Sequence, residues 1–490
     1  MKRRGILLLS LVLMVVLAGC GGNEIAPGAF VGRPGRYDYS PSAIRTGNQI
    51  QIWWCGMAKN PENPDQDSDA ILYETVDDST NLKSAPLTVL AETANAWDSF
   101  FVCNPRVIRG SFADPLEDGQ TYTYALYYVA TSSSAGVANS IGVAFSNDGI
   151  HFKKYPQPVI VADNPFLYGM GQPSVYNADG KSHLLMFYEV SEGAPYHVEA
   201  ESTDGVHFTT VGTITQNGMD PNNAHPSWGD MAYDSSDHAW YAVFNLPARN
   251  ADTTGNAQER GQYGIQIYRI PDASLLTGTT PWRLVATYDT NRTGYESNFL
   301  AGLEKDQFGN LSREQWPKLR FFPSIATPPA SWDASPNDMA AADDPVHWDI
   351  GSMVWDPSVT TVALNRYRHG GDYETTSGYI DPGSGLVVEA TLGHLYSAPQ
   401  AGATTPFYNC KSDRKDFFVS SDPLCGGKYV VGLQGYGYAP SQALEMPVGA
   451  SSSSPVAMYS CVSLGGGHFV SVDPACGKQG AGTLLGYALP

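Results

Sequence analysis

The chain has few basic residues, almost no helix signals and no Cys-x-x-Cys pair. Its 29 Lys and Arg stand against 49 Asp and Glu, which gives a formal net charge of −20. A surface of that sign repels phosphate backbones, so nucleic acid is not expected as a partner. The lack of Cys-x-x-Cys argues against a zinc ribbon or a thiol redox site. A chain of 490 residues exceeds one typical hydrophobic core, and two folded units are expected.

A small polar residue followed by Pro recurs three times, each time ahead of an alternating strand, a turn and an aromatic strand. The three openings are Ser40-Pro41-Ser42-Ala43-Ile44, Asn104-Pro105-Arg106-Val107-Ile108 and Gln172-Pro173-Ser174-Val175-Tyr176. Their Pro residues are 64 and 68 positions apart. Repetition at that period in an all-strand sequence predicts a β-propeller, in which each repeat builds one blade. Less regular openings near His225 and Glu296 give five blades over residues 37–398, with six as the alternative.

Two Asp-Gly pairs, Asp148-Gly149 and Asp204-Gly205, end strands of the second and third repeats. Glycine there supplies the positive φ that a tight hairpin requires, and the aromatic residue that follows packs between blades. These Asp residues are therefore predicted to form turns and are not candidates for catalysis.

Blades that open with x-Pro-Ser-x-Ile and close on Ser-x-Asp-Gly-x-x-Phe resemble the propeller of glycoside hydrolases of families 43, 32 and 130. The resemblance covers roughly residues 37–398 and is specific for the propeller clan, not for one family. It implies a carbohydrate ligand at one mouth of the central channel, where the opening residues of all blades meet. In those hydrolases an Asp that opens the first blade, a second Asp and a Glu perform the acid and base chemistry that sugar hydrolysis requires.

The carboxylates of those hydrolases do not transfer directly, because the positions before Pro hold residues that cannot ionise. The remaining acidic candidates for catalysis are Asp38, Asp230 and Glu296. Glu192 follows a second strand instead of opening a blade, so it is interpreted as a loop residue, and Glu189 as structural.

Neutral amides and hydroxyls bind sugar oxygens, while flat aromatic rings stack on sugar faces. The candidate substrate-binding residues on this basis are Ser40, Trp54, Asn104, Gln172, His225 and Trp228. No His/Asp cluster has metal-ligand spacing, so no metal or cofactor is predicted. Calcium is common in the channel of such propellers, but the sequence does not indicate it.

After about residue 398 the sequence changes to a tandem repeat, in which two copies with equivalent residues 51 positions apart fill residues 399–490. Cys410 and Cys425 in the first copy, and Cys461 and Cys476 in the second, are each 15 residues apart and are expected to pair. Cys55 and Cys103 are then left for each other. Units this short hold little core, so a disulfide in each is physically reasonable. The repeats resemble a small module at the ends of secreted bacterial proteins.

The N-terminus reads as a secretory signal. Lys2-Arg3-Arg4 precedes an apolar run from Ile6 to Leu17, and Leu17-Ala18-Gly19-Cys20 resembles the bacterial lipoprotein cleavage motif. We expect residues 1–19 to be removed, Cys20 to carry the lipid, and residues 20–36 to act as a tether. Contact with the membrane would then occur through this anchor alone, in the bacterial cell envelope.

The sequence thus favours an all-β surface lipoprotein whose propeller binds an oligo- or polysaccharide. In a second interpretation it also cleaves the glycan, as a glycoside hydrolase or phosphorylase. The alternative is a non-enzymatic adhesion or envelope-interaction protein that uses its C-terminal repeats as the contact surface.

Overall fold

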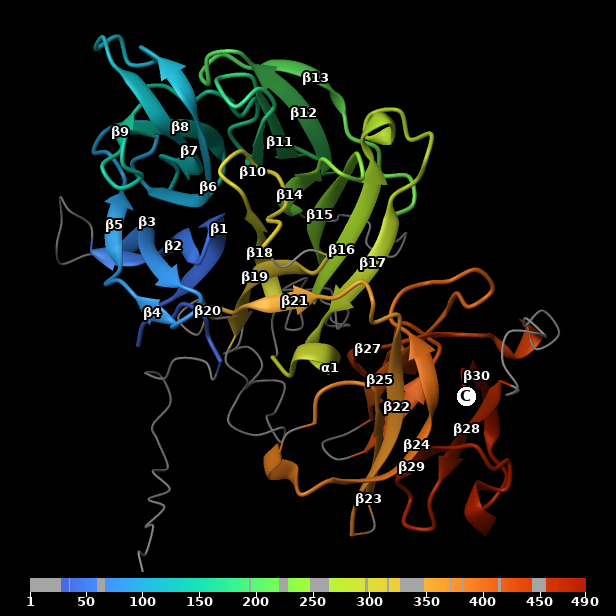
Figure 1. The fold of residues 1–490 in the computed structure, drawn as a ribbon. Coiled ribbons are helices and arrows are strands. Elements are labelled where there is room, and N and C mark those ends of the chain that lie inside the picture. The colour runs from blue at the N-terminus through green and yellow to red at the C-terminus, as the bar shows by residue number, and fades with distance from the viewer. Residues whose placement is uncertain are drawn as a thin grey trace, which may run out of the picture.

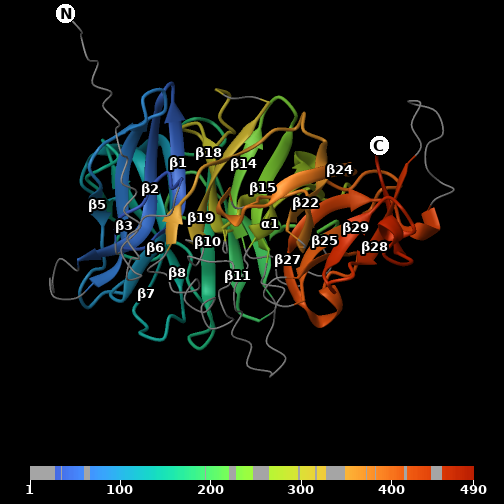
Figure 2. The same cartoon turned by 90° about the horizontal axis from the view of Figure 1, so that it is seen from below.

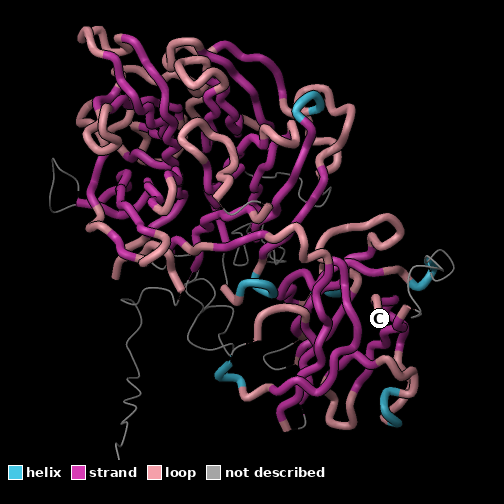
Figure 3. The backbone as a smooth tube through the Cα atoms, viewed as in Figure 1, coloured by secondary structure: helices cyan, strands magenta, loops and turns pink. Residues whose placement is uncertain are grey.

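A computed structural model describes residues 28–34, 36–59, 67–193, 195–219, 228–246, 264–295, 298–314, 317–326, 348–370, 372–380, 382–412, 416–442 and 455–490. The predicted signal peptide and Cys20 lie outside these ranges. Strands dominate the described residues, and the helices are single short turns (Figure 3). Within the described ranges, no helix is long and apolar enough to cross a membrane.

The first three units of the propeller are antiparallel sheets formed by consecutive strands. The first unit contains β1 (Asp38–Thr46), β2 (Gln49–Lys59), β3 (Asp67–Asp77), β4 (Leu82–Lys83) and β5 (Leu87–Leu90). The second contains β6 (Phe101–Ala113), β7 (Thr121–Thr131), β8 (Ser140–Ser146) and β9 (Lys153–Lys154). The third contains β10 (Gly169–Asn177), β11 (Leu184–Ser191), β12 (Tyr196–Ser202) and β13 (Thr209–Thr213).

Two further units follow and bring the chain back to its start. The fourth contains β14 (Trp228–Asp234), β15 (Ala239–Leu246), β16 (Gly264–Pro271) and β17 (Arg283–Tyr288), followed by the short helix α1 (Thr290–Thr293). The fifth contains β18 (Asn298–Lys305) and β19 (Leu319–Ala326), with β20 (Trp348–Ile350) and β21 (Met353–Trp355) both paired to β19. Strand β18 pairs in parallel with β1, and Val31 bridges to Ile350. The N-terminal segment thus joins the last unit.

The innermost strands surround a common centre. In Figure 1 the labels β1, β6, β10, β14 and β18 form a ring, and the later strands of each unit lie farther out. Each innermost strand contacts the next one, and β18 contacts β1 again. Figure 2, turned by 90°, shows the same strands running side by side across the molecule. The predicted radial arrangement of an all-β propeller is therefore confirmed.

Apolar residues fill the space between neighbouring units, because a single sheet cannot bury both of its faces. Each junction has its own buried cluster that draws side chains from both neighbours. Representative pairs are Trp53 with Tyr128, Phe145 with Met186, Phe187 with Trp240, Val243 with Phe321, and Ile52 with Phe322. The last pair joins the first unit to the fifth, so the hydrophobic core also closes into a ring.

The Asp-Gly turns contribute to this packing as the sequence predicts. Gly149 and Gly205 have φ angles of 77° and 83°, in the left-handed region. Their carbonyl oxygens accept hydrogen bonds from the preceding unit, at 2.9 Å from Trp53 Nε1 and 2.7 Å from the Tyr127 hydroxyl. Each turn therefore stabilises an interface between two units.

Every innermost strand carries a β-bulge of one extra residue near its start. In four of them a non-glycine residue is in the left-handed region, namely Ser40, Asn104, Gln172 and Leu300, with φ between 40° and 49°. The first three are the residues before Pro that the sequence singles out. A bulge bends a strand and redirects its side chains. The repeated bulge thus marks the place where each strand turns at the mouth of the ring.

A buried ion cluster lies next to the bulges, where the innermost strands meet. Asp230 of β14 is fully buried, 2.8 Å from Lys305 Nζ of β18 and 3.3 Å from Arg106 Nε of β6. It also accepts hydrogen bonds from Ser174 Oγ of β10 and from the Leu303 amide. Arg106 in turn donates to the Pro41 carbonyl of β1. The cluster connects all five innermost strands.

The sequence predicts two repeats in the C-terminal module. In the described residues the module contains three groups, each of three strands. They are β22 (Thr361–His369), β23 (Asp372–Thr376) and β24 (Val387–Tyr396); β25 (Thr405–Lys411), β26 (Phe417–Ser420) and β27 (Tyr429–Gly437); and β28 (Val456–Val462), β29 (His468–Ser471) and β30 (Thr483–Ala488). The last strands of the groups contact one another in a cycle, through Tyr396 with Tyr436, Tyr438 with Tyr487, and Leu489 with His394. Together they enclose a shared core.

Strands on the two sides of the expected domain border pair with each other. A border between residues 398 and 399 would separate β24 from β27, which belong to one sheet. The module instead begins with β22, whose group contains no cysteine. The other two groups each contain the predicted disulfide, Cys410–Cys425 and Cys461–Cys476, while Cys55–Cys103 joins β2 to β6 in the propeller.

We predict that Asp230→Asn lowers the free energy of unfolding by about 3–5 kcal/mol, because it leaves two buried cations without a compensating charge. Chemical denaturation followed by tryptophan fluorescence measures this change. Asp237→Asn removes a surface partner of Arg269 and is the matched control, with an expected loss of at most about 1 kcal/mol. Equal effects of the two substitutions would contradict a role of the ion cluster in holding the propeller together.

Candidate functional site: the mouth of the propeller

A cavity of about 690 Å³ lies at the bulged ends of the innermost strands. Asn104 of β6, Gln172 of β10 and Leu300 of β18, three of the left-handed bulge residues, line it. Its volume falls within the roughly 300–1,000 Å³ that small-molecule sites usually occupy. Two carboxylates, Asp69 of β3 and Glu189 of β11, also line it. Side chains from separate units thus converge at the mouth, as the radial fold predicts.

Asp69 is held in place by two tyrosine hydroxyls from the start of the propeller. Tyr37 donates a short hydrogen bond to one carboxylate oxygen, and the Tyr39 hydroxyl lies 3.3 Å from the other. Burial raises the pKa of Asp69 above its ordinary value, although the two hydroxyls act in the opposite direction. A carboxyl with a raised pKa keeps its proton to higher pH and can donate it.

Glu189 enters the cavity from the second strand of the third unit. It is 6% exposed, pairs across the sheet with Gly171, and accepts a short hydrogen bond from Ser191 Oγ. The nearest imidazole, His197, lies 4.0 Å away and is fully buried. Desolvation lowers the pKa of His197 to about 3, so this ring is neutral and does not compensate the charge of Glu189 at neutral pH.

Aromatic rings form much of the remaining wall, namely Tyr39, Phe101, Tyr168 and Phe299. Tyr168 is 39% exposed and lies over Gly171, where a Cβ atom would come within 3.2 Å of the ring. Glycine at position 171 therefore makes room for the Tyr168 ring. The cavity combines flat apolar surfaces with carboxylates and amides, which is the composition that sugar-binding sites require.

The structure brings two of the predicted substrate-binding residues into the cavity, Asn104 and Gln172. Ser40 is fully buried at its bulge, and its amide donates to Ser324 Oγ at 3.0 Å. Trp54 is also fully buried and donates to Asp38 at 2.6 Å. Neither of these two side chains lines the cavity.

The predicted catalytic carboxylates that the structure describes have other partners. Asp38 is fully buried and forms an ion pair with Arg33 at 2.6 Å, while its burial raises its pKa. Asp230 lies in the ion cluster, where Lys305 and Arg106 outweigh the cost of burial and lower its pKa. Both carboxylates are buried, and neither lines the cavity at the mouth.

The other predicted site residues lie partly or wholly outside the described part of the chain. Glu296 and His225 fall outside it entirely. Trp228 begins β14, and its side chain is not among those described. These three assignments stay predictions.

Sequence reasoning missed Asp69 and interpreted Glu189 as structural, although both line the cavity. Neither precedes a Pro, and neither belongs to an innermost strand. A weak signal existed for Glu189, since it interrupts the apolar strand Leu184–Val190 at a buried position. Glu192, which accepts a hydrogen bond from the Asn164 amide at 2.8 Å, is a loop residue as expected.

One group of candidate metal ligands occurs among the described residues, formed by Asp69, Cys55 and Cys103. The two sulfurs are bonded to each other, so they offer no thiolate to a metal ion. The carboxylate is left as a single protein ligand, and the group does not fit a metal site.

We predict that Tyr37→Phe raises the pKa of Asp69 further, because the charged carboxylate loses a hydrogen-bond donor. The carboxyl stretching band in infrared spectra, titrated with pH and assigned by comparison with Asp69→Asn, measures the shift. Tyr196→Phe, a tyrosine outside the cavity lining, is the control and should leave the titration unchanged. A pKa that stays constant or falls in Tyr37→Phe would contradict the described geometry.

Known proteins resemble this chain only in structure. No protein-family model and no curated protein sequence matches it.

A glycosyl hydrolase from Bacteroides ovatus is 14% identical over 66% of this chain and 85% of its own, with a TM-score of 0.39. A family 117 glycoside hydrolase from Zobellia galactanivorans is 13% identical over 68% and 87%, with a TM-score of 0.40. A family 62 hydrolase in complex with xylotriose is 11% identical over 68% and 97%, with a TM-score of 0.43. Similarity of this size is too low to transfer an activity or the role of a residue.

Proposed function

We propose that this protein binds an oligo- or polysaccharide in the cavity at the propeller mouth. The observation that carries the proposal is the convergence of Asp69, Asn104 and Glu189 with several aromatic rings in one cavity. Carboxylates and amides offer acceptors and donors to sugar hydroxyls, and the rings offer surfaces on which the apolar faces of sugars stack.

The cavity lining favours neutral sugars over acidic ones. Its described residues include two carboxylates and no Lys or Arg. An acidic sugar would find no basic side chain among these lining residues to compensate its charge in a partly desolvated space. A hydroxyl-rich neutral ring can instead donate hydrogen bonds to Asp69 and Glu189.

The proposed architecture and location agree with this role. The five units that start with β1, β6, β10, β14 and β18 are the five blades of the proposed propeller. Cleavage before Cys20 and acylation of that residue would tether the propeller to a bacterial envelope, where polysaccharides are accessible. The motif Leu17-Ala18-Gly19-Cys20 supports this part of the proposal.

We predict that Tyr168→Ala weakens oligosaccharide binding about tenfold, which corresponds to roughly 1.4 kcal/mol of lost stacking. Isothermal titration calorimetry with a panel of neutral oligosaccharides first identifies the ligand and then compares the variants. Tyr196→Ala is the matched control, since Tyr196 is 41% exposed, Tyr168 is 39% exposed, and Tyr196 does not line the cavity. The proposal fails if Tyr196→Ala weakens binding as much as Tyr168→Ala does. It also fails if the C-terminal module, and not the propeller, accounts for all binding.

A second candidate function, hydrolysis of the bound glycan, is favoured by the two carboxylates and by the raised pKa of one of them. Glycosidases use one protonated carboxyl to donate to the leaving oxygen and a second, ionised carboxylate as nucleophile or base. Asp69 would be the acid, because burial favours its protonated form. Glu189 would be the nucleophile or base, since it enters the same cavity from another blade.

For hydrolysis, we predict that Asp69→Asn and Glu189→Gln each lower kcat by 10²- to 10⁴-fold while oligosaccharide binding persists. Activity should fall as the pH rises through the raised pKa of Asp69, because the acid then loses its proton. Release of reducing sugar from the bound oligosaccharide measures both effects. Glu192→Gln, in a neighbouring loop, is the control and should retain activity. Full activity in either cavity variant would eliminate this second function and leave the binding proposal intact.

A further inference from the structure

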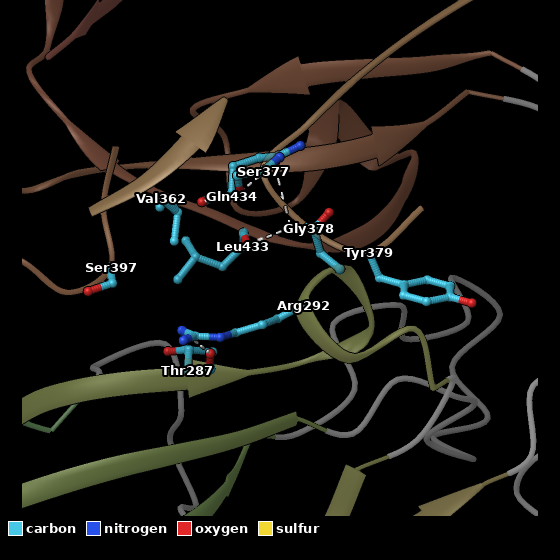
Figure 4. Close-up of a pocket in the computed structure, with 11 residues that line it drawn as sticks. Thr287, Arg292, Val362, Ser377, Gly378, Tyr379, Ser397, Leu433 and Gln434 are labelled. Carbon is cyan, nitrogen blue, oxygen red and sulfur yellow. Dashed lines mark hydrogen bonds between the residues drawn. The ribbon is translucent and has the colours of Figure 1, made fainter. Parts of the chain in front are cut away.

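A second cavity, of about 280 Å³, lies where the propeller meets the C-terminal module (Figure 4). Thr287 of β17 and Arg292 of α1 form its propeller side. Val362 of β22 and Leu433 and Gln434 of β27 form the opposite side. Figure 4 shows Arg292 and Thr287 close together across the cavity from these module residues. The volume is near the lower end of the range for small-molecule sites and suits one sugar-sized group.

The walls of this cavity are fixed by hydrogen bonds across the junction. Asn291 is 3% exposed and donates to the Leu433 carbonyl at 2.9 Å, while its own side-chain oxygen accepts from Thr376 at 2.8 Å. Asp289 accepts from the Leu433 amide at 2.7 Å. Gly378 approaches so closely that a Cβ would lie 1.7 Å from the Asn291 carbonyl oxygen. A ligand would therefore meet a preformed site and lose little affinity to ordering of the walls.

Most arginines that the structure describes form an ion pair with a carboxylate. Arg292 does not, because no described carboxylate lies within ion-pair distance of it. Its guanidinium stacks on the Tyr288 ring, 4.3 Å from the centroid, and one nitrogen points to the Thr287 carbonyl at 3.5 Å. In a chain with a net charge of −20, a half-buried cation without an acidic partner is conspicuous. Most of its donors are left for a ligand.

Thr287 provides a second, independent observation at the same place. It is 5% exposed, and its hydroxyl oxygen is buried without a hydrogen-bond partner among the described residues. An unsatisfied buried hydroxyl destabilises the fold, and a bound polar group would remove that cost. Thr287 and Arg292 both line this cavity.

We infer that this junction cavity binds a sugar acid, with its carboxylate on Arg292 and Thr287. A planar guanidinium matches a carboxylate through two parallel hydrogen bonds, and the threonine hydroxyl can donate a third. Val362 and Leu433 give the apolar contact that a sugar ring needs. This site is separate from the mouth cavity and shares no lining residue with it.

Calorimetric titration of the full chain with D-glucuronate and D-galacturonate tests this inference, with D-glucose and inorganic phosphate as comparison ligands. We expect at least one sugar acid to bind and glucose not to bind. Arg292→Gln should weaken binding at least tenfold. Arg292→Lys should weaken it less, because lysine keeps the charge and loses the paired donors. Thr287→Val should weaken binding several-fold, since it removes the hydroxyl and keeps the shape.

Arg283→Gln is the matched control, because Arg283 lies on the same strand β17, is exposed and does not line this cavity. It should leave the affinity unchanged. The inference is overturned if neither acid binds, if glucose or phosphate binds as tightly, or if Arg292→Gln and Thr287→Val both bind as well as the unmodified chain. Tyr168→Ala should not change acid binding, so this result and that for the mouth are independent.

Discussion

One buried carboxylate, Asp230, holds the centre of the propeller together. Charges removed from water are costly unless they are paired and hydrogen-bonded, and here Arg106 and Lys305 are both buried. They can be compensated only when β6, β14 and β18 come together around Asp230. Ring closure and charge compensation are therefore coupled. Asp230 is fully buried in this cluster and does not line the cavity at the mouth.

The mouth shows what sequence can and cannot locate. Ser40, Asn104 and Gln172 could be found because each precedes Pro in a recurring pattern, and the structure places each in a left-handed bulge at the start of an innermost strand. Which of their side chains reach the cavity depends on how the bulge turns each strand. Asp69 has no sequence signal, and Glu189 is interpreted as structural, because both come from outer strands and reach the mouth only through folding.

The C-terminal module shows the same limit for repeats. Two of its groups were recognised because both contain a Cys pair at the same spacing. The group at Thr361–Tyr396 has no cysteine, although its Leu364 and Leu395 enter the shared core with Phe407 and Met458. Its position is set by packing and by the cyclic contacts of the closing strands. A repeat defined by residues 51 positions apart therefore does not include this group.

Charge distinguishes the two cavities. At the mouth, Asp69 and Glu189 lie without a described Lys or Arg in the lining, so the local field opposes anions and favours hydroxyl-rich neutral sugars. At the junction, the described lining instead contains the cation Arg292 and no Asp or Glu. A glycan with both neutral and acidic residues could then contact one chain at two sites. Hydrogen bonds of Asp289 and Asn291 to Leu433 hold the junction, and a second contact on one polymer would strengthen binding through its high effective concentration.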